Sequence, residues 1–215
     1  MLLLKNFPEN IGIMGRRKKT ALRIIPENYL DPIDFKQHFP HPERPLEVDI
    51  GCGKGRFLAG RSGRVPQHNF LGIERLLGRV HQSGRRCERA GRENVRIFRM
   101  EGFYAIRYLM PEAYVRAYYI LFPDPWPKAR HHAHRLFNPA FMDALHRTLE
   151  AGGTLHVATD HLPYFAEIDA LLESDPRFER IAPFQPAEEE RTDFELLFRD
   201  KPIGRCSFRK RPPAG

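Results

Sequence analysis

The sequence predicts an α/β fold built on a doubly wound, mostly parallel sheet with helices on both faces. Two observations support this. Short apolar runs alternate with segments of helix length, and a glycine-rich turn directly follows the first of these runs, at residues 51–55. Strand-then-helix repetition implies right-handed crossovers and parallel strands. With 215 residues, 41% of them hydrophobic, the chain can bury one full core, so we expect a single domain.

Five apolar runs predict the parallel strands. They cover residues 46–50, 69–73, 95–99, 117–122 and 154–159. The segments between them are long enough for helices. In residues 75–90 a helical period places four apolar side chains on one face, namely Leu76, Leu77, Val80 and Cys87. Ligands of such sheets bind beyond the carboxyl ends of the strands, so we expect the functional residues there.

The two ends of the chain differ from this pattern. Residues 1–45 contain the basic block Arg16–Lys19 and prolines that interrupt regular structure, so we interpret them as an extended basic arm; a solvated tail is the alternative. The domain then spans residues 46–215. In its last third, three further runs predict an antiparallel addition to the sheet edge, namely Phe178–Ile181, Phe194–Phe198 and Arg205–Phe208.

Charge and cysteine usage limit the partners and the compartment. The formal net charge is +8 and the pI is about 9.6, which favours a polyanionic partner such as nucleic acid. Cys52, Cys87 and Cys206 form no C-x-x-C pair, so we expect neither disulfides nor zinc, and a reducing cytoplasm. The apolar run Met1–Leu4 is too short for a signal peptide or a membrane span.

The first glycine-rich turn predicts a cofactor loop. Gly51, Gly53 and Gly55 let the backbone turn tightly and approach a ligand closely. Arg56 stands where a dinucleotide fingerprint requires glycine, which disfavours a pyrophosphate. Glu74, at the end of the next strand, is placed to accept hydrogen bonds from ribose hydroxyls, or to favour a helix N-terminus. Asp49 is placed to meet a cationic group. Together these residues favour S-adenosyl-L-methionine.

The segment Ile120–Lys128 is the most unusual part of the sequence. Prolines at 123, 125 and 127 fix φ at alternate positions and restrict the residue before each of them, which makes a stiff loop. Asp124 and Trp126 are held in this loop at the ligand-binding edge of the sheet. A proline-rich turn anchored by a packed tryptophan is the structural alternative.

At these motifs the chain resembles the bacterial tRNA (guanine-N7-)-methyltransferases. The matching segments, in the family's order, are Val48–Gly55, Gly72–Glu74, Phe122–Lys128 with Arg130–His132, Ala158–Asp160 and Thr192–Glu195. The resemblance implies a class I methyltransferase fold, whose doubly wound, mostly parallel sheet has seven strands and an antiparallel C-terminal edge. It also implies that the target guanine lies in the variable loop of tRNA.

The resemblance assigns roles to individual residues. Asp49, Gly51, Gly53 and Glu74 would contact S-adenosyl-L-methionine, and Glu101 would line the adenine pocket, where the family usually has Asp or Asn followed by Ala. Asp124 would lie between cofactor and substrate. The tRNA or its guanine would be contacted by Lys128, Arg130, Asp160, Thr192 and Glu195. Phosphates are the expected partners of Lys128, Arg130 and Arg135.

Guanine N7 has a lone pair and no proton, so methylation at this atom needs no general base. We expect Asp124 to be the catalytic residue, accepting hydrogen bonds from the guanine and stabilising the cation that develops, with Asp160 and Glu195 as alternatives. Trp126, His131 and His132 are placed to receive an unstacked base. No metal is expected, since no carboxylate or cysteine joins these histidines at ligand spacing. The protein is expected to be a monomer or a homodimer.

Two other functions are compatible with the sequence. A methyltransferase of another RNA base would keep the cofactor loop and change the acceptor. An inactive methyltransferase-like module that only binds RNA is the rival from a different class. Glu101-Gly102 in place of the family's usual pair, and the few lysines after Lys128, make this second reading conceivable. Cofactor binding and methyl transfer separate the three possibilities.

Overall fold

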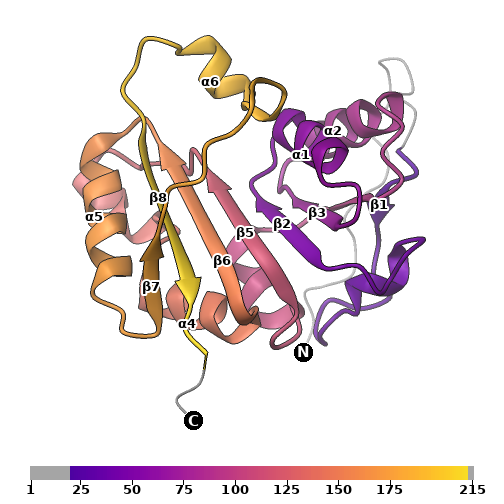
Figure 1. The fold of residues 1–215 in the computed structure, drawn as a ribbon, viewed down its shortest axis with the longest axis horizontal. Helices are drawn as coiled ribbons and strands as arrows, with labels where there is room; N and C mark the ends of the chain where they lie inside the picture. The colour runs from indigo at the N-terminus through magenta and orange to yellow at the C-terminus, as the bar shows by residue number, and fades with distance from the viewer. Residues whose placement is uncertain (1–19, 213–215) are drawn as a thin grey trace.

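The computed structural model describes residues 20–212, which form one mixed sheet with helices on both faces (Figure 1). The strands lie in the order β1-β4-β3-β2-β5-β6-β8-β7, and all pairings are parallel except those of β8 with β6 and β7. Their bounds are β1 Arg23–Ile24, β2 Leu46–Ile50, β3 Asn69–Ile73, β4 Val95–Phe98, β5 Val115–Leu121, β6 Leu149–Thr159, β7 Phe178–Ile181 and β8 Gly204–Lys210. The predicted fold class and its antiparallel C-terminal edge are confirmed.

The helices follow the strands, as expected for a doubly wound sheet. The α-helices are α1 Arg56–Arg64, α2 Leu77–Arg89, α3 Gly102–Tyr104, α4 Pro139–Thr148, α5 Leu162–Glu173 and α6 Asp193–Leu197. A π-helix, η2 Ala105–Leu109, continues α3, and short 3₁₀ turns are η1 Phe35–His38, η3 Ala129–His134 and η4 Glu188–Glu190. Helix α4 begins where Asn138 accepts a hydrogen bond from the Phe141 N–H and Pro139 takes the first helical position.

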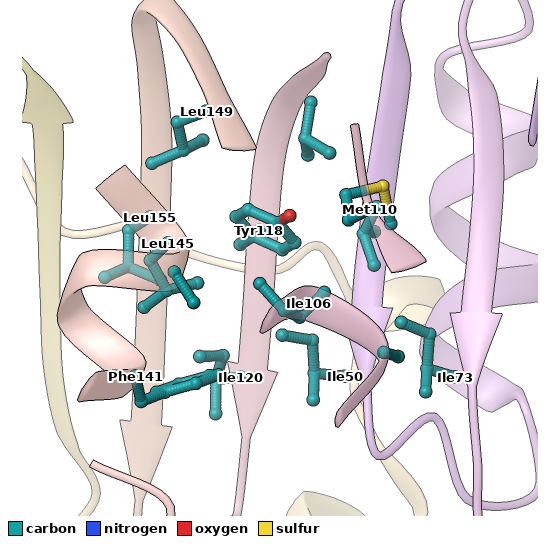
Figure 2. Close-up of a cluster of buried hydrophobic side chains, with 14 of the residues drawn as sticks. Ile50, Ile73, Ile106, Met110, Tyr118, Ile120, Phe141, Leu145, Leu149 and Leu155 are labelled. Carbon is teal, nitrogen blue, oxygen red and sulfur yellow. The ribbon is translucent and has the colours of Figure 1, made fainter. Parts of the chain in front are cut away.

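Side chains that alternate along the strands build a separate core on each face. On one face, Phe70 of β3 and Ile97 of β4 pack with side chains of α1 and α2, such as Leu58 and Val80. The larger core lies on the opposite face, under η2, α4 and α5. Figure 2 shows part of it, where strand residues meet helical ones, namely Ile50, Ile73, Tyr118 and Ile120 with Ile106, Phe141 and Leu145. The sheet is therefore rigid beneath its carboxyl edge.

Two local predictions are wrong. Residues 194–198 were expected to form a strand, yet Asp193–Leu197 is a helix, because Thr192 and Glu195 form a capping box that starts it. Leu76 and Leu77 were expected on the buried face of the helix that begins near residue 75. They are 46% and 38% exposed because the buried face of α2 instead carries Val80, Ser83, Gly84 and Cys87.

The sheet has one strand more than the seven expected. The additional strand, β1, lies in the segment that was predicted to be a basic arm. It pairs in parallel with β4, and Phe35 and Phe39 nearby are buried in the core. The segment 20–45 is therefore anchored to the domain at a few positions, while much of it is exposed. The basic block Arg16–Lys19 lies outside the described residues. Among residues 20–212, no helix combines the length and apolar character that crossing a membrane requires.

Thr20 joins this N-terminal segment to helix α2. Its hydroxyl donates to Glu88 at 2.6 Å, and the Ala21 N–H donates to the same carboxylate oxygen at 2.8 Å. Thr20 fits there because α2 has a glycine opposite it. A Cβ on Gly84 would lie 2.2 Å from the Thr20 hydroxyl oxygen and 2.5 Å from its Cβ.

We therefore expect Gly84→Ala to lower the free energy of unfolding by about 1–3 kcal/mol through overpacking. Gly78, in the same helix, is the matched control, because a Cβ there has nothing within 4 Å. Gly78→Ala is expected to raise the free energy of unfolding by up to about 1 kcal/mol through helix propensity. Urea denaturation measures both changes. Equal effects of the two substitutions would contradict close packing of Thr20 on α2.

Candidate active site

A cavity of about 640 Å³ lies where four parallel strands end. Each strand end contributes to its wall: Gly51 after β2, Glu74 after β3, Glu101 after β4 and Asp124 after β5. The carboxyl ends of parallel strands meet at one edge of a sheet, which is where such folds bind ligands. The volume falls in the range of small-molecule and cofactor sites. Four of the predicted site residues thus share one cavity.

The glycine-rich turn reaches the cavity through Gly51. Gly51 has a φ of 81°, in the left-handed region that favours glycine, and the N–H groups of Gly51 and Cys52 both donate to the Ile73 carbonyl. A Cβ on Gly51 would meet nothing within 4 Å, so open space adjoins its backbone. Gly53 does not line the cavity; its N–H donates to Glu74. The turn therefore lets a ligand approach the main chain closely.

Glu74 holds the turn and the next helix together. One carboxylate oxygen accepts from the Gly53 N–H at 3.1 Å and the other from the Leu76 N–H at 2.7 Å. The residue is only 5% exposed, yet it lines the cavity. Since each carboxylate oxygen has a second lone pair, Glu74 retains the capacity to accept ribose hydroxyls as well.

Asp49 is buried beside the cavity without lining it. Its exposure is 4%, and no hydrogen bond or ion pair to the described part of the chain holds its carboxylate. Burial, together with repulsion from the charge of Glu74, raises the pKa of Asp49 to about 8. A buried carboxyl of this kind favours a cationic neighbour, because such a neighbour stabilises the ionised form.

Glu101 also has a structural role in addition to its place in the wall. Its carboxylate accepts hydrogen bonds from the N–H groups of Phe103 and Tyr104 and so caps α3. Gly102 follows because a Cβ there would lie 2.7 Å from the Ile50 side chain. Glu101-Gly102 stands where Asp or Asn followed by Ala was expected. This pair therefore keeps a carboxylate in the cavity wall and allows a close contact between α3 and β2.

The proline-rich loop after β5 is strained as well as stiff. Phe122 and Trp126 have φ of 56° and 43°, and they are two of the three non-glycine residues with positive φ among those described. Asp124 lies between them, exposed and in the cavity wall. The Trp126 ring lies 5.0 Å from that of His134, centroid to centroid, and both residues line the cavity. Strain of this kind is typical of functional loops.

Arg135 holds this loop from beneath, which corrects its predicted role. Its guanidinium donates to the Pro125 carbonyl at 2.9 Å, pairs with Glu167 of α5 and lies 4.7 Å from the centroid of the Tyr164 ring. The residue lines the cavity but is only 8% exposed, and its guanidinium is already engaged by these three partners rather than free to meet phosphates. Arg135 instead fixes the backbone next to Asp124.

The sequence of this chain matches a known protein family. A sequence model of the family described as "Putative methyltransferase" matches residues 43–196. A tRNA (guanine-N(7)-)-methyltransferase from Acinetobacter baylyi is 35% identical over 190 residues, which cover 83% of this chain and 77% of that protein. The chain belongs to the tRNA (guanine-N(7)-)-methyltransferase family. The predicted resemblance is confirmed.

Other tRNA (guanine-N(7)-)-methyltransferases match over different lengths. The protein from Nitrosococcus oceani is 36% identical, with 89% of this chain and 84% of that protein covered. The protein from Rubrobacter xylanophilus is also 36% identical, with 64% of this chain and 61% of that protein covered. Among solved structures, the 16S rRNA methyltransferase KamB has a TM-score of 0.58 at 12% identity, covering 78% of this chain and 88% of that one. The antibiotic-resistance methyltransferase Kmr has a TM-score of 0.52 at 21% identity, covering 79% of this chain and 88% of that one. These likenesses show the class I methyltransferase fold.

Five residues to which the resemblance to tRNA (guanine-N(7)-)-methyltransferases gave substrate contacts lie outside the cavity wall. Lys128 and Arg130 are exposed beside it, at the start of η3. Asp160 follows β6 and pairs with Lys201 at 3.2 Å. Thr192 accepts from the Glu195 N–H and Glu195 accepts from the Thr192 N–H, which is the capping box of α6. Glu195 also pairs with Arg205 and is 5% exposed.

The arginines on and next to α2 have two different roles. Arg75, just before the helix, and Arg79 line the rim of the cavity and are exposed. Arg86 instead pairs with Asp193 of α6 at 3.1 Å, and Arg92 donates to the Ala59 carbonyl. The two arginines at the rim are placed to meet an anionic ligand. The other two fasten neighbouring segments.

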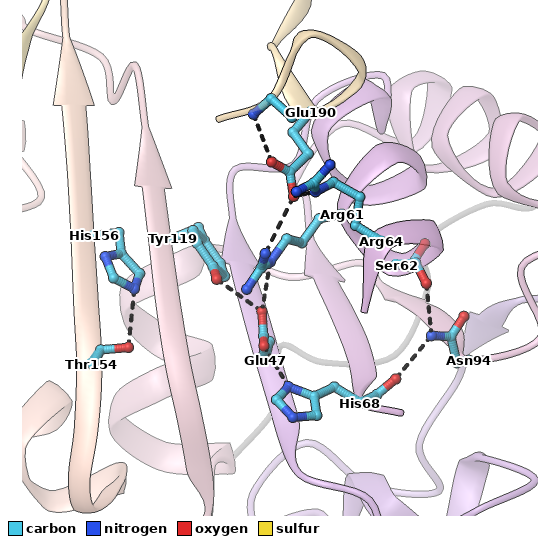
Figure 3. Close-up of polar contacts among 11 residues, drawn as sticks. Glu47, Arg61, Ser62, Arg64, His68, Asn94, Tyr119, Thr154, His156 and Glu190 are labelled. Atoms are coloured by element: carbon cyan, nitrogen blue, oxygen red, sulfur yellow. Dashed lines mark hydrogen bonds and ion pairs between the residues drawn. The ribbon is translucent and has the colours of Figure 1, made fainter. Parts of the chain in front are cut away.

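A buried ion-pair network joins β2, α1 and η4, and the sequence motifs did not indicate it. Arg61 of α1 donates to Glu47 of β2 at 3.2 Å and to Glu190 of η4 at 3.3 Å (Figure 3). Glu47 also contacts His68 at 2.6 Å and accepts from the Tyr119 hydroxyl at 2.9 Å. The segment that leads to α6 is thereby tied to the strand that leads to the cofactor turn.

Proposed function

We propose that this protein transfers a methyl group from S-adenosyl-L-methionine to N7 of a guanine in the variable loop of tRNA. The observation that carries the proposal is the placement of Asp124. The strained proline loop presents its carboxylate in the same cavity wall as Gly51 and Glu74, so one cavity joins the residues assigned to cofactor and to acceptor. Family membership and the net charge of +8 agree with an RNA substrate.

The residues present fit S-adenosyl-L-methionine. The open space beside Gly51 admits the main part of a ligand, Glu74 offers acceptors to ribose hydroxyls, and the buried carboxyl of Asp49 suits a cation nearby. Apolar side chains complete a slot for the adenine, namely Ile50, Ile73, Met100 and Phe103. When bound, the cofactor supplies a methyl group activated by a positively charged sulfur.

The chain's own residues then have three tasks. The wall holds the acceptor base in line, and positioning of this kind is worth effective molarities of about 10⁵–10⁸ M. Asp124 accepts hydrogen bonds from the guanine N1–H and amino group and stabilises the positive charge that develops on the ring. The rings of Trp126 and His134 cover an unstacked base and exclude water. No residue has to remove a proton from N7.

The direct test incubates the purified protein with unmodified tRNA and methyl-labelled S-adenosyl-L-methionine. Nucleoside mass spectrometry identifies the product, and aniline cleavage locates it in the chain. We expect 7-methylguanosine at one position of the variable loop. A different methylated nucleoside would overturn the acceptor assignment, and cofactor binding without transfer would support the RNA-binding alternative. We also propose that the protein acts in the cytoplasm, as a monomer or homodimer and without a metal.

Cofactor binding is expected to release a proton from Asp49. Because its pKa is raised to about 8, this carboxyl is mostly protonated at pH 7 in the free protein, and a cation beside it favours ionisation. Calorimetric titration at pH 7 in phosphate and in Tris should give binding enthalpies that differ with the ionisation enthalpy of the buffer. Asp49→Asn should remove this dependence. Equal enthalpies for the unchanged protein in both buffers would contradict the assignment.

The same group links stability to pH in a defined direction. Its folded pKa lies above the ordinary value of 3.8, so the native state binds the proton more tightly than the unfolded chain does. The stability contributed by this linkage is fully present below pH 3.8 and is lost as the pH rises through about 8. The difference in unfolding free energy between the unchanged protein and Asp49→Asn should therefore vary between these pH values.

A further inference from the structure

Helix α6 turns its apolar side chains outward. Phe194, Leu197 and Phe198 are 49%, 75% and 38% exposed, whereas Glu195 on the inner side is 5% exposed. This is the reverse of the usual surface helix, which buries its apolar side. Neighbouring exposed apolar side chains on a soluble protein mark contact sites more often than isolated ones do. We call these three residues the α6 face.

The α6 face is connected to the cavity through Phe122. Phe122 lines the cavity, and its ring is stacked on that of Phe194 with centroids 5.7 Å apart and planes at 13°. The Phe194 ring in turn lies 5.6 Å from that of Phe198. A continuous run of three aromatic rings therefore leads from the wall beside Asp124 to the outside of the molecule.

The orientation of α6 is fixed from its inner side. Glu195 pairs with Arg205 of β8, and Asp193 pairs with Arg86 of α2. The capping box of Thr192 and Glu195 holds the first turn. Because these contacts come from two other elements, the helix cannot rotate to bury its rings without breaking them. The apolar side is thus presented outward by the fold itself.

Cations border the α6 face. The Lys201 ammonium lies 4.3 Å from the centroid of the Phe198 ring and pairs with Asp160 at 3.2 Å. The Arg199 side chain is 64% exposed and lies 4.0 Å from Glu188. Aromatic rings next to Lys and Arg are typical of surfaces that bind unpaired nucleotides, where bases stack and phosphates meet the cations. The apolar centre of a protein interface is instead depleted in lysine. This charge arrangement favours RNA over a second protein as the occupant.

We propose that the α6 face is a stacking surface for an unpaired nucleobase of the RNA acceptor that neighbours the base being methylated. The inference rests on the proposed function for the identity of the RNA. It assigns to Phe194 and Phe198 a role in holding the acceptor, separate from the chemistry at Asp124. The connection through Phe122 places such a base next to the one in the cavity.

Phe198→Leu tests the proposal, because it keeps an apolar side chain of similar size and removes the aromatic ring. We expect the Kd for an unmodified tRNA transcript to rise about 5- to 10-fold, as loss of one stacked base does. Phe198→Tyr should remain within about twofold of the unchanged protein. Tyr108→Leu is the matched control, since Tyr108 is 48% exposed on η2, lies outside the cavity wall and should leave the tRNA Kd unchanged.

Calorimetry with S-adenosyl-L-methionine checks that each variant retains the cofactor site, and Phe194→Leu supplies a second position. If Phe198→Leu and Phe194→Leu bind tRNA as tightly as the unchanged protein, the stacking surface is wrong. If instead they convert a dimer into a monomer in sedimentation experiments, the occupant is a second copy and the proposal is overturned. These affinities are measured without turnover, so failure of the unchanged protein to methylate tRNA counts against the proposed function alone.

Discussion

Asp124→Asn is expected to lower kcat by about 100- to 1,000-fold. The amide has the same shape and keeps the loop, but it lacks the negative charge that would stabilise the cation developing on the guanine, and loss of a single electrostatic contact of this kind costs about that much. The loop is already held by the prolines and by the bond from Arg135 to Pro125. The substitution therefore changes the charge and little else.

Single-turnover methylation of tRNA, with cofactor bound in advance, measures this effect. Asp160→Asn is the matched comparison, because Asp160 also follows a parallel strand but lies outside the cavity wall and pairs with Lys201. It should lose less than about tenfold. Near-normal turnover of Asp124→Asn would contradict the catalytic role of Asp124. A larger loss of kcat in Asp160→Asn than in Asp124→Asn would assign that role to Asp160 instead.

Arg61→Met is expected to have the largest effect on stability, lowering the free energy of unfolding by about 3–5 kcal/mol. The side chains of Glu47 and Glu190 are only 3% and 2% exposed, and both pair with this guanidinium. Burial opposes ionisation of Glu47, but the bond with His68 and the charge of Arg61 outweigh it and keep its pKa below the usual value. Methionine fills similar space and leaves two buried carboxylates without their shared cation.

Arg64→Met provides the control on the same helix. Its side chain is 53% exposed and pairs with the exposed Glu189 at 3.1 Å. Its distance to the buried Glu190 is longer, 3.6 Å, and Glu190 keeps Arg61 as a partner in this variant, so the loss should stay well below that of Arg61→Met. Urea denaturation of both variants at neutral pH gives the comparison. Similar losses from Arg61→Met and Arg64→Met would show that the network contributes no more than a surface ion pair.

Apolar runs predicted most of the sheet because its central strands, such as β2 and β3, are buried on both faces. The runs at 46–50, 69–73 and 178–181 coincide with β2, β3 and β7. The run at 194–198 failed because its apolar residues face outward on a helix, and the signal that identifies it is the capping box Thr192-x-x-Glu195 rather than hydrophobicity. The hydrogen bonds of the capping box start helix α6, and a pattern of apolar residues does not reveal them.

The residues of the candidate site also fall into those that the sequence could predict and those that it could not. Gly51, Glu74, Glu101 and Asp124 could be predicted to meet because the ends of parallel strands must lie at one edge. The contacts that hold the surrounding segments in place could not be predicted in this way. Arg61 and Glu190 are 129 residues apart, and no local pattern indicates that they touch. Arg135 looked like a phosphate ligand because its sequence neighbours are basic, yet the fold buries it under the proline loop.

The placement of β8 affects how the protein is made. It lies between β6 and β7, although both of these strands are synthesised before it. Until residues 204–210 leave the ribosome, β6 is the open edge of the sheet and β7 has no partner among the described strands. An apolar strand with unpaired backbone groups is a template for aggregation. Chains interrupted before residue 204 should therefore depend on chaperones or proteases, with the methyltransferase cavity already formed in outline but the sheet beneath it unfinished.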